Sequence, residues 1–310
     1  MPTVSIVLPT FNRLRYIPDT IASIFAQTFV DWELLITDDG SDAATRAYLE
    51  TLGEVPRVRF IPLSHTGRPA VVRNKAIREA SGEYIAFMDS DDIWVPSKLD
   101  TQIKAMQAQP SNRWCHTQFV LVDERGETRQ MAAADGWILN PLLEAKTVIA
   151  LPSVLVSRQL LASVGGFDES LTMCEDYDLW LRLAAVTRIV AIHEPLTRIR
   201  RHTAHYGNPC IALGDGLRVL EKALASNLGA HSRKIARRAH ATYSAMLAKR
   251  YAIIGRRLES LGLLLKTAPA AWRYPRWWRI ALAAAVSASI PRARHWRQRY
   301  QLRTAPKRVQ

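Results

Sequence analysis

The first hundred residues alternate between short apolar runs and segments that carry apolar side chains at helical spacing. Four runs rich in Val, Ile and Leu predict strands, at 4–8, 33–37, 58–62 and 84–88. Apolar residues every three or four positions predict the helices between them, at 17–26, 43–52 and 71–80. Strands that alternate with helices predict a parallel sheet, and strands that are apolar throughout predict that helices cover both of its faces.

The same mixed pattern continues to about residue 206. We expect a helix from Pro96 to about Ala108, a strand at 114–122 followed by a hairpin turn at 124–127, and a short strand at 154–156. Residues 175–185 predict an amphipathic helix that opens with two acidic side chains. At the end of the third helix, Ser81-Gly82 predicts a left-handed exit.

Beyond residue 206 the strand pattern stops. Residues 211–265 predict helices throughout, and residues 272–303 mix Trp, Arg and small apolar residues. Two domains are therefore predicted, a mixed α/β domain at 1–206 and a basic helical region at 207–310.

Charge separates the two regions as well. Residues 211–310 hold 21 Lys and Arg against 3 Asp and Glu, whereas residues 1–210 hold 21 against 25. The net charge is thus +18 in the last hundred residues and −4 before them. Such asymmetry predicts an anionic partner for the C-terminal region, either a membrane surface or a nucleic acid. No recognised nucleic-acid-binding module accompanies the charge, so we expect no nucleic-acid partner.

The three cysteines are scattered, without a CxxC pair, which favours a reducing compartment over a disulfide framework or zinc site. The N-terminal residues lack the features of a secretory signal. We therefore expect a cytoplasmic protein.

Polar residues follow three of the predicted strands. They are Pro9-Thr10-Phe11-Asn12-Arg13 after the first strand, Asp38-Asp39-Gly40-Ser41 after the second and Asp89-Ser90-Asp91-Asp92 after the fourth. Ligands of open parallel sheets bind at the carboxyl ends of the strands, so these loops form a candidate site. Turn formation alone explains one such loop, but three in register favour a site.

Two carboxylates one residue apart, Asp89 and Asp91, suit Mg²⁺ or Mn²⁺, which prefer oxygen ligands and share phosphate oxygens. The chain has neither GxGxxG nor GxxxxGK[ST], which weakens a dehydrogenase or P-loop interpretation. Phosphates would then be neutralised by the metal, by Arg73 and by the cluster Arg198, Arg200, Arg201 and His202.

Six segments, taken together, resemble a known family. They lie at 5–13, 38–41, 73–74, 89–94, 165–168 and 175–182. In order and spacing they are similar to the family 2 glycosyltransferases of the GT-A fold, and the resemblance extends from residue 3 to about residue 205. It implies a Rossmann-like, mostly parallel sheet flanked by helices, followed here by the helical C-terminal region. It also implies an inverting transferase that uses a divalent cation and a nucleotide-activated sugar, most often a UDP-sugar.

The resemblance assigns roles to individual residues. Asp176 would be the catalytic base, Asp91 a metal ligand, and Asp89 would lie near both the metal and the ribose. The nucleotide would be bound by Asp89 together with Pro9, Thr10, Asn12, Arg13, Asp39, Arg73, Arg200 and His202. We expect Asp176 to stay ionised near neutral pH because the helix dipole favours the anion, although helix capping alone would also explain Glu175 and Asp176.

In the inverting reaction an acceptor hydroxyl attacks the anomeric carbon on the face opposite the nucleotide, so one base suffices. The acceptor is expected to be a glycan or a lipid-linked glycan. A QxxRW-type element and long transmembrane segments are both absent from the sequence, which favours single additions over polymer synthesis.

Two alternatives remain, a catalytically silent sugar-nucleotide-binding scaffold on the same fold and a nucleotidyltransferase. The first has no need of all three aspartates Asp89, Asp91 and Asp176, and the second would usually show a glycine-rich loop after the first strand.

The C-terminal segment 272–303 has two interpretations. Its apolar run 280–290 is too short to span a bilayer, for which about 20 residues are needed. Tryptophan and arginine flank the run, which is typical of a helix lying among anionic headgroups at the inner face of the cytoplasmic membrane. The alternative is a helical appendage packed on the catalytic domain, with a solvated basic face.

Overall fold

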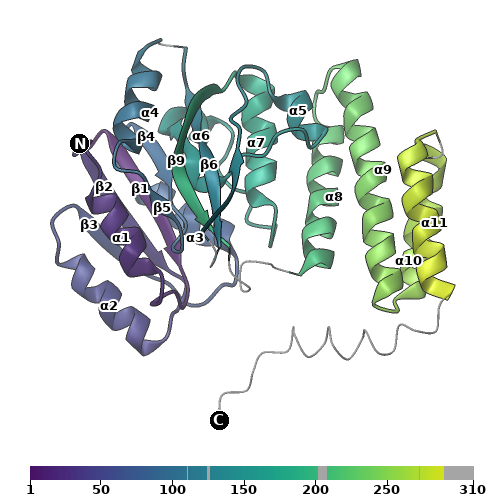
Figure 1. Ribbon diagram of the computed structural model, residues 1–310, viewed down its shortest axis with the longest axis horizontal. Helices are drawn as coiled ribbons and strands as arrows, with labels where there is room; N and C mark the ends of the chain where they lie inside the picture. The colour runs from purple at the N-terminus through teal and green to yellow at the C-terminus, as the bar shows by residue number, and fades with distance from the viewer. Residues whose placement is uncertain (110, 124–125, 202–207, 272, 290–310) are drawn as a thin grey trace. The chain divides into compact units, whose positions relative to one another are not determined.

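The computed structural model describes residues 1–109, 111–123, 126–201, 208–271 and 273–289. Its contacts divide the chain into two units, Met1–Tyr206 and Gly207–Gln310 (Figure 1).

The first unit is an α/β structure. Its strands are β1 (Val4–Thr10), β2 (Trp32–Asp38), β3 (Val58–Pro62), β4 (Tyr84–Phe87), β5 (Ile93–Trp94), β6 (Trp114–Asp123), β7 (Gly126–Met131), β8 (Val154–Ser157) and β9 (Val190–Arg200). Its α-helices are α1 (Ile17–Phe25), α2 (Ala43–Gly53), α3 (Pro69–Glu79), α4 (Lys98–Gln107), α5 (Leu139–Leu143), α6 (Arg158–Ser163) and α7 (Glu175–Val186). A 3-10 turn, η1 (Leu151–Ser153), precedes β8.

All the strands described belong to one sheet, in the order β3-β2-β1-β4-β8-β6-β9-β5, with β7 paired to β6. The first four are parallel, which aligns the carboxyl ends of β1, β2 and β4 at one edge. The rest of the sheet is mixed, since β8 runs antiparallel to both β4 and β6 while β9 runs parallel to β6. The predicted α/β class is confirmed, and the parallel arrangement is confined mainly to the first four strands.

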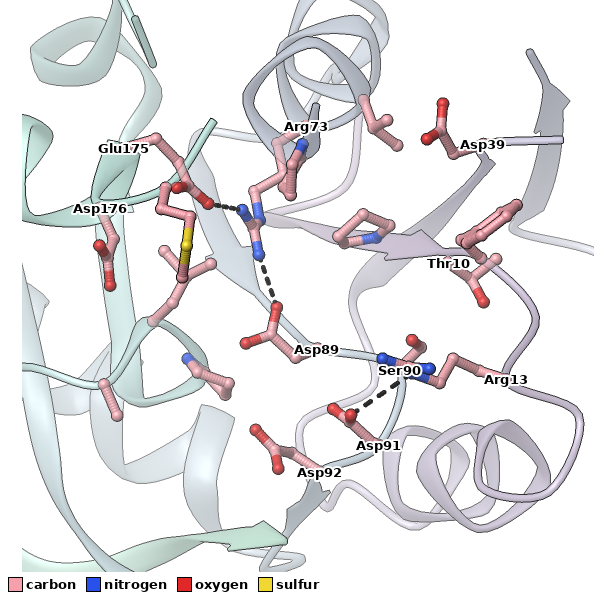
Figure 2. Close-up of a pocket in the computed structure, with 18 of the residues that line it drawn as sticks. Thr10, Arg13, Asp39, Arg73, Asp89, Ser90, Asp91, Asp92, Glu175 and Asp176 are labelled. Carbon is pink, nitrogen blue, oxygen red and sulfur yellow. Dashed lines mark hydrogen bonds and ion pairs between the residues drawn. The ribbon is translucent and has the colours of Figure 1, made fainter. Parts of the chain in front are cut away.

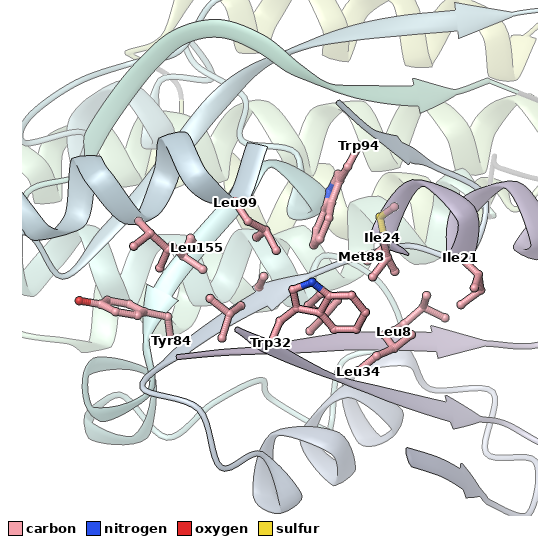
Figure 3. Close-up of a cluster of buried hydrophobic side chains, with 14 of the residues drawn as sticks. Leu8, Ile21, Ile24, Trp32, Leu34, Tyr84, Met88, Trp94, Leu99 and Leu155 are labelled. Carbon is pink, nitrogen blue, oxygen red and sulfur yellow. The ribbon is translucent and has the colours of Figure 1, made fainter. Parts of the chain in front are cut away.

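A hydrophobic core lies between these strands and the helices α1 and α4 (Figure 3). In α1, Ile17, Ile21 and Ile24 are buried, a spacing that places them on one face of the helix. Their partners include Leu8 of β1 and Leu34 of β2, which are fully buried. This packing fixes α1 against the sheet and, with it, the loop that links β1 to α1.

The exit from α3 differs from the prediction. Ala80 is extended and Gly82 is not among the residues with positive φ, so no left-handed residue ends this helix. Glycine is needed at position 82 for another reason. A Cβ there would lie 2.6 Å from the backbone nitrogen of Ser5, because the chain passes directly against β1. The Gly82 N–H also donates to Ser5 Oγ at 2.8 Å.

The long strand β9 was not predicted, because Pro195 interrupts its pattern. Proline cannot donate to a sheet ladder and is confined to edges and bulges. The pairing of β9 with β6 shifts register on both sides of the Gln118–Pro195 pair, so the proline lies at a bulge. At this bulge the missing N–H of Pro195 does not interrupt the regular hydrogen bonding between β6 and β9.

The second unit is helical, and it consists in its described part of α8 (Pro209–Ala225), α9 (Ala230–Ile253), α10 (Arg257–Ala271) and α11 (Pro275–Ser289). The helices α8, α10 and α11 each pack along α9. Trp277 is buried in a small core with Ala241, Ala245 and Ala281, so α11 packs on its neighbours. No described helix is both long and apolar enough to cross a membrane. Trp272 and residues 290–303 of the proposed interfacial segment lie outside the described residues.

Candidate nucleotide-sugar site

A cavity of 630 Å³ opens where β1, β2 and β4 end and where α7 begins (Figure 2). Its other walls come from the segment 148–152 and from Phe119 and Ile199. Most of the residues predicted from the sequence line it. They are Pro9, Thr10, Arg13, Asp39, Arg73, Asp89, Asp91 and Asp176.

Arg73 of α3 connects the two sides of the cavity. Its Nη1 donates to Glu175 Oε1 at 2.6 Å, and its Nη2 donates to Asp89 Oδ1 at 2.8 Å (Figure 2). The Arg73 side chain is 8% exposed, so its pair with Glu175 is largely shielded from water, whereas the Asp89 partner is 27% exposed. Burial by itself would lower the pKa of Arg73, but the carboxylates of Asp89, Glu175 and Asp176 raise it above its ordinary value. The guanidinium is therefore a fixed positive charge in the cavity.

Asp176, on the first turn of α7, has a pKa raised to about 6. Burial is the main cause, and the neighbouring charge of Glu175 adds to it. The N–H of Tyr177, which donates to Asp176 Oδ1 at 2.7 Å, and the charge of Arg73 act in the opposite direction. Asp176 is thus ionised near neutral pH, as predicted, although burial outweighs the groups that stabilise its anion and raises its pKa. A carboxyl with this pKa is ionised at pH 7 and is a stronger base than an ordinary aspartate.

The loop after β4 concentrates three carboxylates. Asp91 Oδ2 lies 3.5 Å from Arg13 Nε, across the cavity edge (Figure 2). Asp92 is buried and accepts the N–H of Arg200 at 2.9 Å. Burial, together with the charges of Asp89 and Asp91, raises the pKa of Asp92 well above its usual range. Its Oδ2 is buried without a hydrogen bond among the described residues.

Asp39 holds the loop that follows β3. One carboxylate oxygen accepts the N–H and hydroxyl of Thr66, both at 2.8 Å, and the other accepts the N–H of Gly67 at 2.9 Å. His65 Nδ1 lies 2.8 Å from the Asp39 carbonyl oxygen, and the His65 ring stacks on Phe11 at a centroid distance of 4.2 Å. Asp39 therefore positions His65, whose ring stacks on Phe11 at the cavity wall, and the sequence alone did not predict this contact.

Two predicted nucleotide-binding residues, Asn12 and Arg200, make contacts outside the cavity. Asn12 bridges the loops after β1 and β2, since its N–H donates to Ser41 Oγ and its Oδ1 accepts the N–H of Asp42. Arg200 donates to Asp19 of α1 at 2.7 Å, and neither Asn12 nor Arg200 lines the cavity. His202 lies outside the described residues.

The segment 165–168 supports the site from behind. Asn74, beside Arg73 on α3, donates to the Phe167 carbonyl at 2.9 Å and accepts the Phe167 N–H at 3.0 Å. Gly166 has φ +67°, and a Cβ there would lie 2.9 Å from Asn74 Oδ1. From the sequence no separate role followed for Asn74, and only helix capping followed for Glu175. Their positions in the 73–74 and 175–182 segments were the available signal.

The carboxylates of Asp89 and Asp91 fit a divalent cation by chemistry, because hard oxygen donors select Mg²⁺ or Mn²⁺. Among the described residues, no cluster of three or more potential protein ligands is preformed. That is compatible with an ion that takes one or two carboxylates and completes its shell with phosphate oxygens and water.

The fold and this carboxylate-rich cavity at the strand ends define the class: a GT-A fold. The chain is similar throughout to S. aureus TarS residues 1–349, solved with UDP-GlcNAc, at TM-score 0.70 and 18% identity, with 97% of this chain and 92% of the other covered. It is also similar in fold to the mannosyltransferase PcManGT of Pyrobaculum calidifontis, solved with GDP-Man and Mn²⁺, at TM-score 0.57 and 20% identity, with 97% and 85% covered.

The sequence comparisons identify the family. Residues 5–151 match the model of glycosyl transferase family 2. The chain is 32% identical over 190 residues to the Escherichia coli β-1,3-glucosyltransferase WfgD. The aligned residues are 61% of this chain and 73% of WfgD. The chain belongs to glycosyl transferase family 2, as its motifs predicted.

Other relatives are longer than this chain. An uncharacterized glycosyltransferase of Rickettsia felis is 30% identical over 199 residues, which are 64% of this chain and 33% of that protein. The chain spans about a third of the length of the first Rickettsia relatives.

Proposed function

We propose that the protein is an inverting glycosyltransferase that moves a sugar from a nucleoside-diphosphate sugar to an acceptor hydroxyl in the synthesis of a cell-envelope polysaccharide. The observation that carries this proposal is the Arg73 bridge. It brings the candidate base Asp176 into the same cavity as Asp89 and Asp91. A donor phosphate and an acceptor hydroxyl can then be bound within one cavity.

In this mechanism, different residues of the cavity bind the donor, hold the metal and accept the proton. Asp39, through its loop, and Thr10 bind the nucleoside, while Arg13 and Arg73 contribute positive charge beside the diphosphate. Asp89 and Asp91 would hold Mn²⁺ or Mg²⁺, which when bound supplies positive charge to the leaving diphosphate. Asp176 accepts the proton of the acceptor hydroxyl as it attacks the anomeric carbon. The apolar wall of Ile149, Leu151 and Phe119 limits water in this part of the cavity.

A UDP-sugar donor and a lipid-linked acceptor are the finer part of the proposal. WfgD is named as transferring from UDP-Glc to GlcNAc-diphosphoundecaprenol, and TuaG of Bacillus subtilis is named as a putative teichuronic acid biosynthesis enzyme. A GDP-sugar is the alternative donor, because PcManGT was solved with GDP-Man. These relatives support envelope polysaccharides and lipid-linked saccharides as acceptors to test first.

The test is a panel of UDP-, GDP- and dTDP-sugars offered with undecaprenol-diphosphate-linked and free saccharide acceptors, with release of nucleoside diphosphate as the measurement. We expect acceptor-dependent release that stops with EDTA and returns with Mn²⁺ or Mg²⁺. Asp91→Asn should lose this response, whereas Asp100→Asn, a surface carboxylate paired with Lys104, should retain it. Pyrophosphate release would identify a nucleotidyltransferase, and donor binding without turnover a silent scaffold.

A further inference from the structure

The helix α10 exposes a stripe of leucines. Leu258, Leu261 and Leu265 are 84%, 55% and 65% exposed, and their spacing places them on one face of the helix. The opposite face is packed. Ser260 is buried and its hydroxyl donates to the carbonyl of Ala248 in α9 at 2.8 Å. The leucines therefore face away from α9.

The neighbouring helix α11 has the same division. Trp277 and Ala281 are buried in the core of the second unit, whereas Trp278 and Leu282, one turn apart, are 47% and 61% exposed. Figure 1 shows α11 lying along α9 on the side away from α8. Since α10 and α11 also contact each other, their exposed apolar side chains lie on adjacent helices. We call this set the apolar surface; it consists of Leu258, Leu261, Leu265, Trp278 and Leu282.

Cations border the apolar surface. On α10, Arg257 and Lys266 are exposed and, by helix geometry, lie on opposite sides of the leucine stripe, about 70° and about 110° from its centre. On α11, Arg279 is exposed and lies about 80° from the centre of the face that holds Trp278 and Leu282. The sole acidic residue of positions 257–289 is Glu259, and it accepts a hydrogen bond from Arg256 at 2.8 Å. Long basic side chains beside an apolar stripe can reach headgroup phosphates while the stripe enters the acyl boundary.

We propose that α10 and α11 form a docking surface for an anionic phospholipid membrane, on which the protein lies without crossing it. The charge selects this partner over a second copy of the chain, because a self-complementary contact would bring these arginines and lysines against one another. The proposal goes beyond the transfer reaction, since it concerns the second unit alone and its readout is binding. It also enlarges the segment expected from the sequence, which began at residue 272 and omitted α10.

The test is cosedimentation of the full chain with vesicles of phosphatidylglycerol and phosphatidylcholine at several salt concentrations. We expect tight binding at low salt and weaker but measurable binding at high salt, because salt screens the charges but not apolar burial. A triple variant with Leu258→Gln, Leu261→Gln and Leu265→Gln should bind about 100-fold more weakly and should lose the binding that persists at high salt. A triple variant with Arg257→Gln, Lys266→Gln and Arg279→Gln should weaken low-salt binding about tenfold.

Matched controls distinguish binding through the apolar surface from nonspecific binding through other exposed apolar or charged residues. The apolar control removes two exposed apolar residues from α8 and α9, by Ile211→Gln and Met246→Gln. The charge control removes three exposed charges from α9, by Lys234→Gln, Arg237→Gln and Arg238→Gln. Both controls should bind nearly as the wild type does. Circular dichroism verifies that each variant is folded. Failure of the wild type to bind, equal losses in controls and test variants, or a dimer that the leucine variant dissociates would overturn the proposal.

Discussion

Arg73 and Glu175, which are 102 positions apart in the chain, form a largely buried ion pair of 2.6 Å at the centre of the candidate site. The pair joins α3, which packs on the parallel strands, to the first turn of α7. Because Asp176 follows Glu175, this contact also places the candidate base. The electrostatics of the site therefore depend on a small set of buried charges, and each can be changed separately.

The activity of the wild type should rise with pH through about 6 and then level. Asp176 must be ionised to accept a proton, and its pKa is about 6. Asp176→Asn should lower kcat by about 10² or more, remove the inflection and leave donor affinity close to wild type. Pre-steady-state and steady-state rates from pH 5 to 8, with donor titrations, measure this. Equal losses in rate and donor affinity would instead assign Asp176 a structural role.

Glu175→Gln should move that inflection to lower pH. Its negative charge raises the pKa of Asp176, and glutamine removes the charge while keeping an oxygen that can accept from Arg73. The pH–rate profile is the measurement. Glu144→Gln, on the surface beside Lys146, is the matched control and should leave the inflection unchanged. An unchanged inflection in Glu175→Gln would show that the two carboxyls are not coupled.

Arg73→Gln should have the opposite effect on the inflection, because the positive charge lowers the pKa of Asp176. It should also reduce the free energy of unfolding by about 3–5 kcal/mol, since it leaves carboxylates without their buried partner. Urea unfolding at pH 7 measures the loss. Arg59→Gln breaks the more exposed Glu79 pair and should cost at most about 1 kcal/mol.

Gly166→Ala should be more destabilising than Gly165→Ala. Both glycines have positive φ, +67° and +84°, so alanine is strained at either position by about 1–2 kcal/mol. Only at 166 would the new Cβ also meet Asn74 Oδ1, at 2.9 Å, whereas nothing lies within 4 Å at 165. Urea unfolding of the two variants provides the comparison. Equal losses would mean that Asn74 moves away without cost.

Asp39→Ala should weaken nucleotide affinity by about 1–3 kcal/mol, because it removes the hydrogen bonds that hold Thr66 and Gly67 at the cavity wall. Calorimetric titration with UDP, GDP and dTDP is the measurement. Thr66→Val, which removes the hydroxyl bond but keeps the backbone bonds, should have a smaller effect. Unchanged affinity for all three nucleotides would place the base elsewhere.

The sequence by itself determined the parallel half of the sheet, its helices and the charged residues at the strand ends that line the cavity. Hydrophobic periodicity is a local property, so strands such as Val58–Pro62 were predicted at their observed bounds. The carboxyl ends of parallel strands share an edge, which is why the sequence alone predicts that Thr10, Asp39 and Asp89 belong to one site.

Tertiary structure decided what depends on contacts between distant segments. The Arg73–Glu175 pair, the raised pKa of Asp176 and the Asp39 loop each require two segments whose meeting no local pattern encodes. The same holds for position 82, where glycine is required because the chain passes directly against β1 and not because a helix ends there. In the second unit, composition showed tryptophan and arginine, but only packing could bury Trp277 and leave Trp278 exposed. Burial and pairing are properties of neighbours in space, and the sequence lists neighbours only along the chain.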